Sequence, residues 1–236
     1  MTKRFLPFAA LLLIPTLAMG HGDVAPQPIN TDALPDLGED WMDENPYRAE
    51  AAGAEVWATA VKIGASGYNQ NCARCHGLEV VSGGLAPDLR YLSADLDGDE
   101  WYVERFRHGY TQNGVTKMPA FGELLGQKAA WAIRTYVETR PDDGALDAYS
   151  DTLKTIRDDL VAKAAALDGG ADFAAMKGDL DAHIAKLKGI VGQIETGSGA
   201  PVADSAVSRA LVDLNGTAKG VKAAADALTI GLSAAQ

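Results

Sequence analysis

The chain has 236 residues and a formal net charge of −11. Residues 21–144 carry 20 acidic and 10 basic side chains, and residues 145–236 carry 12 and 9. This balance argues against nucleic acid as a partner, because a phosphate backbone would be repelled. It suits a basic protein partner, since opposite fields steer the encounter of two proteins, although solubility alone also explains it.

The first 20 residues have the pattern of an export signal. Lys3 and Arg4 form a positive start, an apolar run follows, and small residues occupy the cleavage position. The alternative is an uncleaved membrane anchor, but the apolar run is short for a bilayer span and contains prolines. We therefore expect residues 1–20 to be a cleaved signal peptide, and the mature chain to be periplasmic without a membrane span.

Residues 21–45 are rich in proline and acidic side chains and lack periodicity, which predicts an extended arm that lies over a domain or hangs free. Residues 46–141 hold both cysteines and three of the four tryptophans, which indicates a compact core. No strand alternation or βαβ pattern is visible there, so we expect an all-α domain. The expected helices are 52–64, entered from Asn45-Pro46, then 97–109 and 126–140.

Residues 146–236 change to Ala-rich heptads. Three apolar stripes step by three and four residues, and the segments DGG and TGSGAP separate them. We expect a helical hairpin or three-helix bundle over 146–236. The stripes run from Leu153 to Leu167, from Phe173 to Ile194 and from Val207 to Leu228.

The segment NCARCHG holds the only two cysteines of the sequence, Cys72 and Cys75, directly before His76. A structural zinc site needs four ligands, a redox dithiol of the thioredoxin type should lie beside a βαβ unit, and a disulfide would close too small a loop to stabilise much. The remaining interpretation is c-type haem attachment, with both thiols bonded to the porphyrin edge and the imidazole on iron.

One covalent haem c would give this small domain the apolar centre that it otherwise lacks. We expect the first helix to lead into the attachment site and the third to bring Trp131 and Tyr136 across it. Acidic residues such as Asp95, Asp97, Asp99 and Glu100 could orient a partner near the haem, although a solvated loop explains them as well.

The second axial ligand is expected to be Met118, in a proline-stiffened loop between the second and third helices. Met42 in the arm and Met176 on a heptad stripe are better explained structurally, and His108 is expected at a helix end, where it interacts with the helix dipole. Iron held by His76 and Met118 is six-coordinate, with a potential raised by the thioether. We therefore expect a one-electron carrier and not an enzyme.

Two alternatives remain. If Met118 does not bind, the iron keeps an open site, and the protein would be a haem enzyme or gas-binding sensor with His108 as its acid or base. The tail could also be a docking or oligomerising module, although a self-contained bundle is the simpler interpretation.

The CxxCH motif, the proline loop, the MP loop and the last helix together resemble the class I c-type cytochromes. By that likeness the Pro87 carbonyl should accept the imidazole N–H of His76. The segments LGEDWMDENPYR, IGASGYNQNCARCHGLEVVSGGLAPDLRYL, MPAF and WAIRTYVETR are similar to PedF-type periplasmic cytochromes c over about residues 21–141.

This resemblance implies a class I cytochrome c domain over 46–141, with haem held by Cys72, Cys75, His76 and Met118. It also implies electron transfer from a pyrroloquinoline-quinone (PQQ) dependent alcohol dehydrogenase toward a downstream cytochrome or terminal oxidase. It does not extend to residues 146–236.

Overall fold

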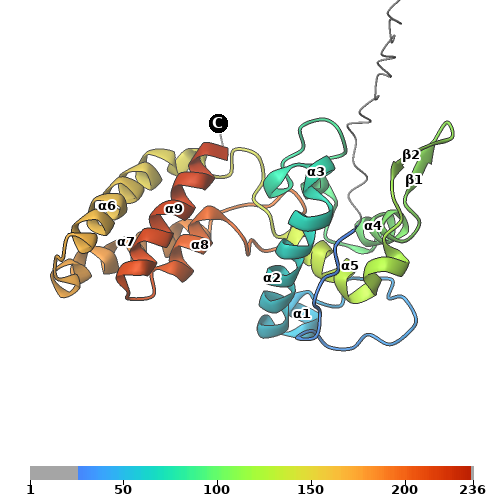
Figure 1. Ribbon diagram of the computed structural model, residues 1–236, viewed down its shortest axis with the longest axis horizontal. Helices are drawn as coiled ribbons and strands as arrows, with labels where there is room; N and C mark the ends of the chain where they lie inside the picture. The colour runs from blue at the N-terminus through green and yellow to red at the C-terminus, as the bar shows by residue number, and fades with distance from the viewer. Residues whose placement is uncertain (1–25, 235–236) are drawn as a thin grey trace, which may run out of the picture.

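The computed structural model describes residues 26–234, so the expected signal peptide lies outside the described part. Two helical lobes lie side by side (Figure 1). The first lobe comprises residues 26–141, and its elements are α1 (Ala49–Ala52), α2 (Ala54–Asn71), α3 (Ala73–His76), α4 (Leu96–His108), β1 (Tyr110–Gln112), β2 (Val115–Met118) and α5 (Gly122–Glu138). The second lobe contains α6 (Ser150–Asp168), α7 (Lys177–Val191), α8 (Ala206–Asp213) and α9 (Ala218–Ala234). Short 3-10 turns cover Leu78–Val80, Leu89–Tyr91, Asp147–Tyr149 and Phe173–Met176.

The mainly helical architecture agrees with the expected fold class. Among residues 26–234, no helix combines the length and the apolar character that a membrane crossing needs.

The first lobe is organised around the crossing of α2 and α5. Gly64 of α2 lies so close to α5 that a Cβ atom there would stand 1.9 Å from the Ala132 carbonyl oxygen. Tyr68 and Tyr136 extend this contact, with ring centroids 5.5 Å apart. The small residue at position 64 therefore permits the close packing on which the lobe depends.

The described part of the arm lies over the first lobe. Leu34 and Tyr47 are buried against Trp131 in one apolar cluster, and Gln127 Nε2 donates to the carbonyl oxygens of Gly38 (2.8 Å) and Asp40 (2.9 Å). Trp131 thus anchors the arm, and its expected packing across the haem site stays a prediction. The sequence pattern did not reveal that this face of α5 would be covered by chain from before α1.

A buried ionic network lies beneath the arm. Asp99 is fully buried and is contacted by Arg48 and by Arg134, each at 2.8 Å. Its carboxylate also accepts from the Asn45 backbone N–H (2.8 Å). Asp99 is therefore a structural ion and not a surface charge that could orient a partner. Asn45 is buried in this network, and no helix begins at Pro46.

Glu138 completes the network, and its carboxylate accepts hydrogen bonds from the Arg48 guanidinium. Burial raises the pKa of Glu138 even though Arg48 and Arg134 act in the opposite direction. Removing one partner from such a buried set leaves an uncompensated charge, so the network holds the arm, α4 and α5 in one arrangement.

A short antiparallel hairpin, β1–β2, differs from the expectation of loop alone. Tyr110 pairs with Met118, and Gln112 pairs with Val115 across a two-residue turn. Asn113 and Gly114 form this turn with φ values of 52° and 75°, as a type I′ connection requires. The hairpin projects from the first lobe at the end remote from α6–α9 (Figure 1).

The second lobe buries the three expected apolar stripes in one core, which includes Leu160, Leu187, Val207 and Leu228. The third stripe is divided between α8 and α9, so four helices form this lobe. The division falls at Asn215-Gly216-Thr217, a turn sequence, where Thr217 Oγ1 accepts from the Gly220 N–H (3.0 Å) and starts α9.

Residues 194–205 return along the edge of the first lobe before α8. The Asp142 N–H donates to Glu195 O (2.9 Å), the Ala203 N–H donates to Thr139 O (3.2 Å), and Ser198 Oγ donates to Glu138 O (2.5 Å). The two lobes are therefore joined by the connecting peptide and by this returning strap.

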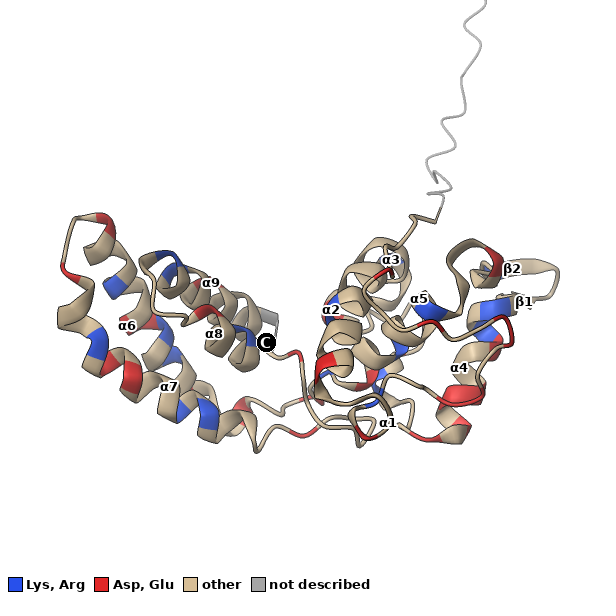
Figure 2. Ribbon diagram, turned by 90° about the horizontal axis from the view of Figure 1, so that it is seen from below, with Lys and Arg blue, Asp and Glu red and all other residues tan. Residues whose placement is uncertain are grey.

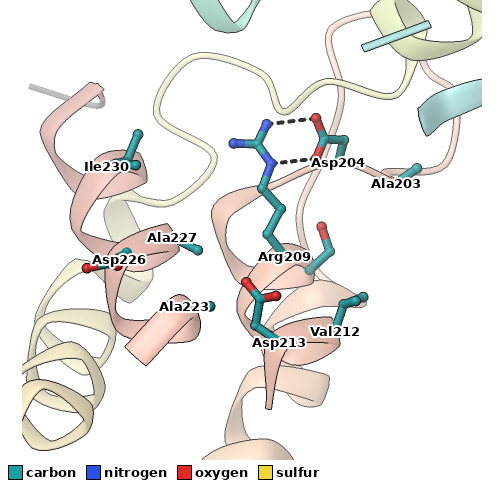
Figure 3. Close-up of a pocket in the computed structure, with 10 residues that line it drawn as sticks. Ala203, Asp204, Arg209, Val212, Asp213, Ala223, Asp226, Ala227 and Ile230 are labelled. Carbon is teal, nitrogen blue, oxygen red and sulfur yellow. Dashed lines mark hydrogen bonds and ion pairs between the residues drawn. The ribbon is translucent and has the colours of Figure 1, made fainter. Parts of the chain in front are cut away.

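A cavity of about 500 Å³ lies between α8, α9 and the end of the strap (Figure 3). Val212, Ala223, Ala227 and Ile230 are among its lining residues, and Arg209 forms ion pairs with Asp204 at its rim. Its lining includes no cysteine or histidine, so it is separate from the CxxCH motif.

Candidate functional site

One helical turn presents the residues of the CxxCH motif. Cys72 follows α2, and the backbone N–H groups of Cys75 (3.1 Å) and His76 (3.0 Å) both donate to the Cys72 carbonyl oxygen. Residues three and four positions apart lie on the same side of a helix. The two thiols and the imidazole are thus brought together by local structure.

His76 is held by its own loop. Its side chain is buried, and Nδ1 lies 2.9 Å from Pro87 O, as the family likeness implied. Because a carbonyl oxygen accepts and does not donate, we assign the proton to Nδ1. The lone pair of Nε2 is then free for a metal, and the Pro87 contact fixes the ring orientation.

The two thiols do not fit the competing types of site. Their sulfur atoms are not bonded to each other, and burial raises the pKa of the Cys72 thiol to about 12. A thiol with a raised pKa is a poor redox nucleophile. Residues 26–234 also contain no group of three or more His, Cys, Asp or Glu side chains that could hold a metal ion.

The chain after His76 makes a tight turn. Gly77 has φ +86°, and a Cβ atom there would stand 1.8 Å from Val81 O. The Tyr68 hydroxyl donates to Gly77 O (2.8 Å) and ties the turn to α2. These contacts restrain the position of the imidazole relative to the thiols.

Cys72 and Met118 pack against the same apolar core although they lie 46 residues apart in sequence. Met118 ends β2 and is half-buried, whereas Met42 is 41% exposed on the arm. The buried members of this core are Val61, Tyr68, Ala73, Val80, Leu89, Tyr102, Phe106, Phe121, Ala130, Ile133, Tyr136 and Val137.

The structure therefore offers two thiols and one oriented imidazole in a single turn, and one thioether that borders the same apolar core as Cys72, a donor set that fits haem c. His108 is exposed at the C-terminus of α4, with Nε2 3.8 Å from a carboxylate oxygen of Glu104. This solvent-facing position agrees with the expected helix-end role and gives no support to His108 as an acid or base in an open iron site.

Comparison with known proteins identifies the fold around this motif. Cytochrome c550 of Pseudomonas aeruginosa is 49% identical over 136 residues, which cover 58% of this chain and 92% of the relative. The chain belongs to the cytochrome c family. A cytochrome c with one CxxCH motif carries one covalently bound haem c, and this cytochrome is an electron-transfer protein and not an enzyme.

Other similarities cover shorter parts of the cytochrome. A family model described as cytochrome c oxidase, cbb3-type, subunit III matches residues 59–137. The quinohemoprotein alcohol dehydrogenase ADH-IIG of Pseudomonas putida is 30% identical over 95 residues, which are 40% of this chain and 12% of that protein. Quinohemoprotein alcohol dehydrogenase ADH IIB of Pseudomonas putida is 34% identical over 82 residues, which are 34% of this chain and 11% of that protein. No solved structure matches the chain.

An ionic cluster beside the motif was not foreseen. Glu79, three residues after His76, contacts Arg140 of the first lobe and Arg209 of α8, and both arginines also contact Asp204 of the strap. The partners of Glu79 are 61 and 130 residues away in sequence. No local pattern could have brought these four residues together.

Proposed function

We propose that this cytochrome is exported to the periplasm, accepts single electrons from a PQQ-dependent alcohol dehydrogenase, and passes them to a downstream cytochrome or terminal oxidase. Cys72 and Cys75 would hold the haem by thioether bonds, and His76 and Met118 would ligate its iron. The observation that carries the carrier role is the fixed imidazole of His76, with Met118 bordering the same apolar core as Cys72.

Each residue has a distinct task in this proposal. Cys72 and Cys75 would fix the group to one turn, the Pro87 carbonyl holds the His76 ring, and Met118 would be the second ligand of the iron and would exclude water or substrate. Haem supplies the one-electron exchange between ferric and ferrous iron. The buried core around the site limits the rearrangement of surrounding groups when the charge of the iron changes.

The donor is proposed from the nature of the relatives. The two similar proteins of Pseudomonas putida are quinohemoprotein alcohol dehydrogenases, so a region like this cytochrome occurs within chains of that activity. Periplasmic export is proposed from the pattern of residues 1–20, with cleavage after Gly20.

The proposal is tested with protein produced in a host that can attach haem c and export it. We expect the mature mass to correspond to residues 21–236 plus one haem, and the pyridine haemochrome spectrum to show two thioether bonds. Stopped-flow mixing with a reduced quinoprotein alcohol dehydrogenase should reduce the iron at a rate that depends on ionic strength. Readily formed carbon monoxide adducts would contradict Met118 ligation, and absent reduction would contradict the donor.

A further inference from the structure

We propose that the electron-donating dehydrogenase docks through an acidic patch of its own surface onto the hairpin face of this cytochrome. The hairpin face consists of Trp101, Arg105, Tyr110, Val115 and Lys117. This inference rests on the proposed function, because it names the surface by which the proposed donor is recognised.

The centre of the hairpin face is a cation held between two aromatic rings. The Arg105 guanidinium carbon lies 5.2 Å from the Trp101 ring centroid and 5.3 Å from that of Tyr110. The rings are 39% and 42% exposed. Stacking orders the guanidinium before any partner arrives, which lowers the entropy lost on binding. Trp, Tyr and Arg are also the residues that most often dominate the energetics of protein interfaces.

The hairpin adds exposed apolar surface beside this stack. Val115 is 54% exposed, and the residues of β1 and β2 other than Met118 are exposed. Lys117 contributes an exposed cation on the same two-stranded ribbon. A mixture of apolar, aromatic and cationic groups suits a short-lived protein complex, in which the apolar groups lose water and the charges set orientation.

The balance of charge along the sequence changes at the segment that contains the hairpin face. Residues 101–128 contain four basic and two acidic side chains, a balance of +2, whereas residues 21–100 contain 4 basic and 15 acidic ones, a balance of −11. Red residues gather at the start of α4 and blue ones at its end near the hairpin (Figure 2). The five residues of the hairpin face include two cations, Arg105 and Lys117, and no acid, so an acidic partner surface complements this face.

The hairpin face is also close to the proposed axial ligand. Lys117 directly precedes Met118, and successive strand residues point to opposite sides, so the exposed lysine is adjacent to a methionine that packs on the same apolar core as Cys72. The second lobe lies at the opposite end of the molecule in both views (Figures 1 and 2). A partner can therefore approach this face without contact with α6–α9.

The test measures reduction of the full-length ferric cytochrome by a purified quinoprotein alcohol dehydrogenase in stopped flow. Arg105→Gln and Lys117→Gln are compared with wild type at ~10 mM and ~150 mM ionic strength, where the Debye length is about 30 Å and 8 Å. Lys188→Gln is the matched control, because Lys188 is an exposed lysine of α7 in the second lobe.

We expect each hairpin-face variant to lower the second-order rate constant at least about threefold at low salt, with a smaller difference at high salt. Lys188→Gln should keep the wild-type rate. Reduction by ascorbate and the sulfur-to-iron charge-transfer band should be the same in all variants, which excludes a disturbed haem site as the cause.

Two failures are distinguishable. If the dehydrogenase reduces the wild type but Arg105→Gln and Lys117→Gln react at the wild-type rate or faster, the hairpin face is not the docking surface, while the proposed function stands. If the wild type is not reduced by the dehydrogenase at all, both the donor and its docking surface are overturned.

Discussion

Arg209 of α8 places Nη2 2.8 Å from Glu79 Oε2, so the second lobe contacts the loop that follows His76. The same guanidinium donates through Nε to Asp204 Oδ1 at 2.6 Å. Arg140 contacts both carboxylates from the first lobe. Each cation therefore bridges two anions, and the haem loop, the strap and the tail share one ionic cluster.

Replacing Arg209 by glutamine should lower the free energy of unfolding of the holoprotein by about 1–3 kcal/mol, because Glu79 and Asp204 each lose one cation. Chemical denaturation followed by far-UV circular dichroism measures the loss. Arg157→Gln is the control, since Arg157 forms an ion pair with its exposed neighbour Asp158 on the surface of α6. Equal stabilities of the two variants would show that the cluster does not hold the lobes together.

The junction should weaken in acid. Burial by itself would raise the pKa of Asp204, but the hydrogen bond from Arg209 and the charge of Arg140 outweigh it and lower the pKa below the usual value. The folded state then binds this proton less well than the unfolded chain does. The contribution of Asp204 to stability is complete above about pH 4 and is lost as the pH falls through the lowered folded pKa.

Hydrogen exchange at pH 5 and pH 3, corrected for the intrinsic rates, should show increased opening of residues 194–205 at the lower pH. Asp204→Asn removes the titrating group and should make the opening less dependent on pH. A variant with the same pH dependence as the wild type would assign the effect to another carboxylate.

Gly64→Ala should destabilise the first lobe by at least about 1–3 kcal/mol, since its Cβ would stand 1.9 Å from a backbone oxygen of α5. Thermal unfolding of the holoprotein measures the change. Gly189→Ala in α7 is the matched control, because a Cβ there meets nothing within 4 Å, and helix propensity predicts a gain of up to about 1 kcal/mol. A tolerated alanine at position 64 would mean that α2 and α5 can separate without cost.

If Met118 ligates the iron as proposed, Met118→Ala should abolish the charge-transfer band of the oxidised protein and lower the reduction potential, because the soft thioether is lost. Met42→Ala should leave both properties unchanged, since Met42 is 41% exposed on the arm. Optical spectra and potentiometry of the two variants make the comparison. A band that survives in Met118→Ala would exclude this residue as the ligand.

The CxxCH turn was predictable because its chemistry is local: Cys72, Cys75 and His76 occupy one helical turn, and three and four residue spacings bring them together. Periodicity also predicted helices near α2, α4 and α5 and the apolar stripes of the second lobe, but it placed the first helix at 52–64, whereas the structure breaks at Gly53 and continues α2 to Asn71. The division between α8 and α9 was missed because the stripe continues across the turn at Asn215-Gly216.

The turn sequence of the hairpin does predict a hairpin. Asn113-Gly114 is a strong type I′ turn sequence, but the flanking strands are too short and polar for alternation to stand out. The buried network around Asp99 and the cluster around Glu79 gave no local signal, because their partners come from distant segments. In the sequence Asp99 cannot be distinguished from its exposed acidic neighbours, whereas in the structure it is buried between Arg48 and Arg134.

The strap has a consequence for how the molecule moves in solution. The chain leaves the first lobe at residue 142, and the strap then returns and forms hydrogen bonds to this same edge through Glu195, Ser198 and Ala203. Because the lobes are connected at more than one point, the second lobe cannot rotate freely about a single peptide bond. The two halves should tumble as one elongated particle. Nuclear relaxation of amides in α5 and α7 should then give a shared rotational correlation time, longer than either half would have alone.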